Sequence, residues 1–131
     1  MAFSFNVSLE MDFDAAVEKV TETLKAHKFG VLTEINVDIV LKAKMDVDMP
    51  RYLILGACNP PIANQMIQAD PDIGSVMPCN VLVRDAGNGQ VVVAFLDPET
   101  VFGLSEQEAI KPILADAKQK LLAVYEDLKT K

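Results

Sequence analysis

The chain has 131 residues, half of them hydrophobic, and its formal net charge of −7 disfavours nucleic acids and anionic membranes, which recruit clustered Lys and Arg. This length predicts a single domain over residues 1–131, and the high mean hydropathy of +0.21 indicates surplus apolar surface, which favours a homodimer. No apolar leader follows Met1 and no stretch of about 18 apolar residues occurs, so we expect a cytoplasmic protein with reduced thiols.

Hydrophobic periodicity predicts four elements in the first third of the chain. Apolar and polar residues alternate over residues 3–9 and 31–37, which is the pattern of strands with one buried face. Apolar residues recur at helical spacing over residues 12–27, which predicts an amphipathic helix. A shorter helix is predicted over residues 39–45, with Asp38 as its N-cap.

A strand, a tight turn and a helix are predicted in the middle of the chain. The continuous apolar run at residues 52–58 predicts a strand that is buried on both faces. Asn59 has the residue type of an N-cap, and Pro60 suits the first helical position, so a helix is predicted over residues 60–69. Cys58 then lies beside the helix N-terminus, where the helix dipole would lower the pKa of its thiol.

Turn residues and periodicity predict the remaining elements. A turn over residues 70–74 precedes two strands, 75–84 and 90–96, which an Asn-Gly dipeptide joins as a β-hairpin. The last helix is predicted over residues 112–129. Taken in order, these elements predict an α+β fold, a two-layer sandwich in which a mixed sheet of about five strands carries helices on one face.

The sequence contains no motif that indicates catalysis or phosphate binding. It has no Gly-rich dinucleotide loop, no phosphate loop and no nucleophile elbow. The single histidine, His27, is predicted in the last turn of a helix, and we interpret it as a solvated group and not as a ligand or base. The sequence therefore indicates no catalytic residue, no metal ligand set and no identifiable cofactor, which favours a protein that is not an enzyme.

The two cysteines stand in similar surroundings, because an asparagine follows each and each ends or interrupts a predicted strand. These surroundings give five candidate ligand-binding residues: Cys58, Asn59, Pro60, Cys79 and Asn80. Their amides and thiols would line a pocket for a small molecule. The two thiols are expected within about 10 Å of each other, somewhat beyond the separation that a disulfide permits.

Three functions remain open for these residues. In the first, the protein is a binding or regulatory module that holds a small ligand. In the second, it is a thiol-based redox enzyme or sensor, with Cys58 as the thiolate and Cys79 as its resolving partner. In the third, the two cysteines and a nearby Met66 or Met77 hold a soft metal such as Cu(I). Each has a simpler rival, in which the cysteines only pack in the core.

Four segments carry a pattern that extends over nearly the whole chain. They are Gly30-Val31-Leu32-Thr33-Glu34-Ile35, Leu55-Gly56-Ala57-Cys58-Asn59-Pro60-Pro61, Pro78-Cys79-Asn80-Val81 and Asp97-Pro98. Together they resemble the family called domain of unknown function 302. The resemblance implies a small bacterial or archaeal α+β domain, likened to the TATA-binding-protein fold and commonly a homodimer. It implies no activity, and the acidic balance argues against DNA binding.

Overall fold

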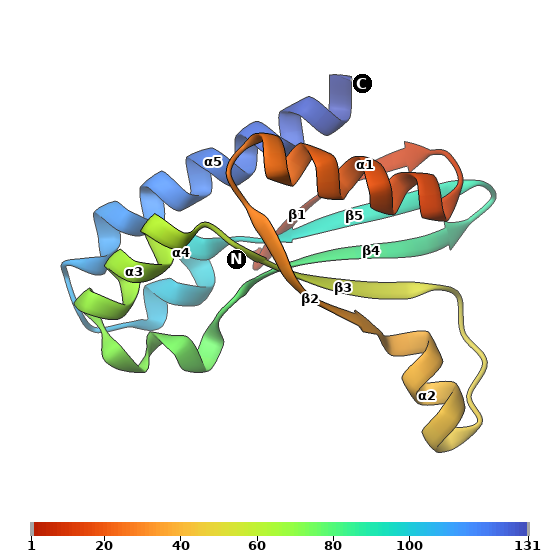
Figure 1. The fold of residues 1–131 in the computed structure, drawn as a ribbon, viewed down its shortest axis with the longest axis horizontal. Coiled ribbons are helices and arrows are strands. Elements are labelled where there is room, and N and C mark those ends of the chain that lie inside the picture. Colours follow the sequence, from red (N-terminus) through yellow and green to blue (C-terminus); the bar gives the residue numbers. More distant parts are fainter. Residues whose placement is uncertain (1, 131) are drawn as a thin grey trace.

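The computed structural model describes residues 2–130, which form an antiparallel sheet of five strands with helices packed on one of its faces (Figure 1). The strands are β1 (Ser4–Glu10), β2 (Gly30–Asn36), β3 (Tyr52–Cys58), β4 (Cys79–Gly87) and β5 (Gln90–Leu96). The α-helices are α1 (Phe13–Ala26), α2 (Val37–Met45), α3 (Pro60–Ala69), α4 (Pro98–Val101) and α5 (Ile110–Thr130). Two short 3₁₀ segments are η1 (Pro71–Val76) and η2 (Phe102–Leu104). Within residues 2–130, no helix combines the length and the apolar character that crossing a membrane requires.

The sheet has the strand order β1-β5-β4-β3-β2, and every neighbouring pair is antiparallel. The prediction of a mixed sheet is therefore wrong. The reason lies between β3 and β4, because α3 and η1 turn back beyond the end of the sheet instead of crossing its face (Figure 1). As a result, β4 returns beside β3 in the opposite direction. The likeness to the TATA-binding-protein fold stays a prediction.

The helical layer covers one face of the sheet, and alternation along each strand decides which side chains it buries. In β3, Leu53, Leu55 and Ala57 are buried in a core that includes side chains of α1 and α5. Tyr52 and Ile54, on the other face of the same strand, are only half-buried. The prediction that this strand is buried on both faces is therefore wrong. Alternate side chains of its continuous apolar run lie in the core on one face of the sheet and on the open face on the other.

A second group of buried side chains extends the core beyond the end of the sheet. Phe102 and Ile110 are fully buried there, together with Ile62 and Met66 of α3. These contacts join α3, η2 and the first turns of α5. These contacts fix the position of α3, and with it the turn between β3 and α3.

Two local predictions are wrong, one for the cap of α2 and one for the start of β4. Asp38 does not cap α2, which begins at Val37 without a side-chain capping hydrogen bond. Its carboxylate instead accepts a hydrogen bond from the backbone N–H of Tyr52 at 3.1 Å. The prediction of an early strand after the turn also fails, because η1 occupies the segment and β4 begins only at Cys79.

His27 lies just after α1 and is not the solvated group that its position suggests. Its Nε2 atom lies 2.6 Å from Oδ2 of Asp127 in α5. The contact joins the two helices that cover the sheet. A partner one hundred residues away in the sequence cannot be predicted from helix periodicity alone.

Candidate functional site

The turn between β3 and α3 has the local geometry that the sequence predicts. Asn59 is 7% exposed, and its Oδ1 atom accepts a hydrogen bond from the backbone N–H of Ile62 at 3.2 Å. Pro60 occupies the first helical position and is exposed. The amide oxygen of Asn59 is thus committed to the cap of α3, which makes this residue structural before it is a ligand contact.

The two cysteines are free and are not near each other. Ala57, and not Cys58, is the register partner of Cys79, so the two cysteines do not form a cross-strand pair. The expectation of a cysteine pair is therefore wrong. Residues 2–130 show neither the two-thiol redox mechanism nor a Cu(I) site shared by both thiolates, each of which needs the two sulfur atoms together.

The surroundings of both thiols favour the protonated form. Burial raises the pKa of Cys58 above its ordinary value, contrary to the expectation that the helix dipole lowers it. Burial raises the pKa of Cys79 to about 12. Because the thiolate is the nucleophilic form, neither residue is activated for thiol chemistry at neutral pH.

Thiol labelling should separate the two cysteines. We expect iodoacetamide to modify native Cys58 slowly at neutral pH and faster as the pH rises, because the raised pKa keeps its thiol protonated. Cys79 should react more slowly than Cys58, because burial raises its pKa to about 12 and leaves less thiolate. Peptide mass spectrometry of native and denatured samples measures both sites, with the denatured sample as the control. Rapid labelling of native Cys58 at neutral pH would contradict this account.

A small cavity lies beside the turn. Its volume is about 20 Å³, and the residues that line it include Cys58, Cys79, Met66 and Met77. A cavity of this size accommodates about one water molecule. A small organic ligand therefore does not fit in this cavity.

The uncovered face of the sheet carries a larger hollow, which the sequence analysis did not predict. Its volume is about 430 Å³, and residues of β1, β3, β4 and β5 line it. The strand register aligns Asn6, Ala94, Leu82 and Ile54 in one row across these strands. Asn80 also lines this open-face hollow, whereas the other four candidate residues do not. The five candidate residues therefore do not form one site.

Residues 32–47, which we call the β2–α2 arm, form a second feature that sequence analysis missed. Of the ten large hydrophobic side chains that are well exposed among residues 2–130, six lie in this arm. They are Leu32, Ile35, Ile39, Val40, Met45 and Val47. α2 buries none of its residues and extends away from the sheet (Figure 1). An apolar helix that has no buried face in its own chain indicates an interaction surface.

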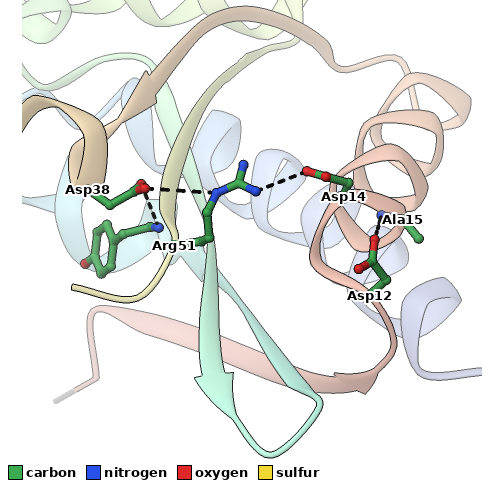
Figure 2. Close-up of polar contacts among 6 residues, drawn as sticks. Asp12, Asp14, Ala15, Asp38 and Arg51 are labelled. Carbon is green, nitrogen blue, oxygen red and sulfur yellow. Dashed lines mark hydrogen bonds and ion pairs between the residues drawn. The ribbon is translucent and has the colours of Figure 1, made fainter. Parts of the chain in front are cut away.

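Arg51 fixes the base of the β2–α2 arm to the body of the protein, as Figure 2 shows. Its Nη1 atom lies 3.3 Å from Oδ1 of Asp14 in α1, and its Nε atom lies 4.0 Å from Oδ2 of Asp38 in α2. The guanidinium carbon lies 4.3 Å from the centre of the Phe13 ring. Asp38 also accepts the hydrogen bond from Tyr52 at the start of β3. One arginine therefore links α1, α2 and β3, which gives the arm a defined orientation although it buries no residue of α2.

Comparison with known proteins identifies relatives of this chain. The family model for the domain of unknown function DUF302 matches residues 5–128. A crystal structure of an uncharacterized conserved DUF302 protein from Bacillus stearothermophilus is similar at a TM-score of 0.86 and 28% sequence identity. The similarity covers 95% of this chain and 96% of that chain. No curated protein matches the sequence.

Proposed function

We propose a function from the geometry alone, because the chain belongs to the DUF302 family, whose domain has no known function. The protein is a binding module that acts as a homodimer, and its β2–α2 arm docks against a second copy. The observation that carries this proposal is that α2 buries none of its residues within its own chain. Short helices are marginal in water unless packing covers their apolar side chains, and a partner supplies that packing.

The apolar side chains of the arm supply a driving force for association. Leu32 and Met45 are each 67% exposed, and Ile39 is 59% exposed. Burying one such side chain completely contributes about 1.5–3 kcal/mol. Six of them on each copy give a surplus that can offset the loss of translational and rotational freedom on association.

Two features favour a second copy over an unrelated partner. β2 is an edge strand, and antiparallel pairing of this strand with its own copy about a two-fold axis is self-complementary. The arm also carries charges of both signs, on Glu34 and Lys44. The side chains of these two residues form no hydrogen bond or ion pair within residues 2–130. A two-fold interface can bring these unlike charges of two copies together, which favours the correct register.

The proposal leaves a reduced role for the five candidate ligand residues. Cys58, Asn59, Pro60 and Cys79 form or border the turn before α3, where the cavity accepts about one water molecule. Asn80 contacts any ligand that occupies the open-face hollow. A cytoplasmic location is also part of the proposal, because both thiols are unpaired.

Sedimentation equilibrium tests the homodimer directly. At micromolar concentration we expect an apparent mass of twice the chain mass of 14.3 kDa. Raising the salt concentration should leave the dimer intact, because apolar burial dominates the proposed interface and screening acts on exposed charges. A single species of 14.3 kDa over the whole concentration range would refute the proposal.

A further inference from the structure

The open-face hollow is suited to a small molecule in size and in the character of its floor. Its volume of about 430 Å³ falls within the range of roughly 300–1,000 Å³ that ligand pockets occupy. The floor is apolar, because Ile54, Leu82 and Ala94 lie side by side in the register of β3, β4 and β5. Val92 and Leu96 of β5 continue this floor.

One charged side chain, Arg84, lines the hollow. Its neighbours in the register are Tyr52 on β3 and Val92 on β5. Arg84 is half-buried, and its guanidinium group makes no hydrogen bond or ion pair with any residue of the part of the chain described, 2–130. The other arginine, Arg51, has carboxylates at both sides of its guanidinium. Arg84 is therefore a partly desolvated cation that no acidic group within residues 2–130 neutralises.

The open-face hollow differs from the rest of the molecule in the sign of its charge. The protein has 19 acidic residues against 12 Lys and Arg, yet none of the carboxylates that the structure describes lines the hollow. The remaining polar side chains of the lining are neutral, and they include Asn6, Asn80 and the Tyr52 hydroxyl. Neutral hydrogen-bonding groups around one guanidinium suit a single anionic group, which a guanidinium binds through two parallel hydrogen bonds.

We propose that the open-face hollow binds a small amphipathic anion, whose one carboxylate or phosphate group contacts Arg84 and whose apolar body lies over Ile54, Leu82 and Ala94. The hollow lies within one chain and on other strands than the β2–α2 arm, so this site does not depend on the homodimer. Cations are disfavoured by Arg84, and a neutral apolar molecule leaves the guanidinium unpaired.

Decanoate and 1-decanol are matched probes, because they share an apolar chain and differ in charge. In an NMR titration we expect decanoate to shift the backbone amide signals of residues 80–84 and 92–96. Decanol should bind at least about tenfold more weakly, because it forms no charge-assisted hydrogen bond with Arg84. Equal affinities for the two probes, or no shift at these strands with either probe, would overturn the proposal.

Three variants sharpen the titration. Arg84→Gln should weaken decanoate binding at least about tenfold and leave decanol binding unchanged. Lys25→Gln makes the same change in net charge on α1, where its exposed side chain is remote from the lining, and should have no effect. Ala94→Trp should abolish binding of both probes by filling the floor, while amide spectra report whether each variant is folded. Unchanged decanoate affinity in folded Arg84→Gln would refute the role of Arg84.

A further measurement distinguishes this site from the dimer interface. The monomeric form expected for the double variant Ile39→Asp/Met45→Asp should bind decanoate with the affinity of the unmodified protein. If decanoate instead dissociates a dimer of the unmodified protein, the hollow is covered by the second copy, and the proposal of a ligand site there is wrong. If the protein is monomeric and still binds decanoate through Arg84, only the homodimer proposal fails.

Discussion

Replacing both Ile39 and Met45 by aspartate is expected to convert the proposed homodimer into a monomer. The two side chains are 59% and 67% exposed in the single chain, and the proposed interface buries them. Each substitution places a carboxylate among apolar groups, and the two-fold axis brings like charges of the two copies together. We expect the dissociation constant, measured by sedimentation equilibrium, to rise at least about 100-fold.

The double substitution should not change the fold of the rest of the protein. α2 buries no residue, so the variant should stay folded as a monomer and unfold in one cooperative thermal transition. The matched control is Ile67→Asp/Leu104→Asp, which alters two exposed apolar residues outside the arm and should remain dimeric. A dimeric arm variant, or a control variant that dissociates equally, would assign the interface to another surface.

Replacing Gly56 by alanine is expected to destabilise the protein by about 1–3 kcal/mol, because a Cβ atom has no room there. An ideal Cβ at this position would overlap the Thr33 hydroxyl and lie 2.9 Å from Cγ of Pro78. Thr33 can rotate, whereas the proline ring is rigid. In an ordinary strand the same substitution would stabilise by about 0.5–1 kcal/mol, so the sign of the change is diagnostic. Urea unfolding measures it.

Two further variants test the steric explanation for Gly56. Gly74→Ala is the matched control, because nothing lies within 4 Å of its added Cβ, and it should be neutral or slightly stabilising. Thr33→Ala removes the overlapping hydroxyl and should recover part of the loss in a double-mutant cycle. A stabilised Gly56→Ala variant would show that Thr33 and Pro78 move apart freely.

Local sequence signals predicted the centre of the chain well. The strand β3 and the helix α3 have the predicted bounds, because Asn59 and Pro60 mark the boundary between them through their own backbone preferences. The hairpin between β4 and β5 is confirmed as well, with positive φ angles at Asn88 and Gly89 in its turn. In each case, the residues that determine the structure are adjacent in the sequence.

Sequence analysis could not predict the features that depend on pairing between strands distant in the sequence. The open-face hollow needs the register of four strands, and Arg84 alone looks like an ordinary solvated residue of a strand. Cys58 and Cys79 likewise fail to form a cross-strand pair because the pairing of β3 with β4 is offset by one residue. A shift of one residue in the strand register would turn every side chain of the strand to the opposite face, and no local pattern determines this register.

Sequence analysis did not predict the β2–α2 arm as an exposed surface for a different reason. Its apolar residues at helical and strand spacing are those of a segment with a buried face, and the sequence does not indicate which molecule buries that face. Sequence analysis predicted Asp38 only as a helix N-cap, and the contacts of Asp38 and Arg51 that set the orientation of the arm join α1, α2 and β3, which no local pattern brings together.

Isotope-filtered NOE spectroscopy on a mixture of labelled and unlabelled chains tests the homodimer and its interface most directly. The account predicts intermolecular NOEs from the methyl groups of Ile35, Ile39 and Met45, and none from Leu82 or Ala94 in the open-face hollow. Intermolecular NOEs confined to the hollow, or their complete absence at millimolar concentration, would contradict it.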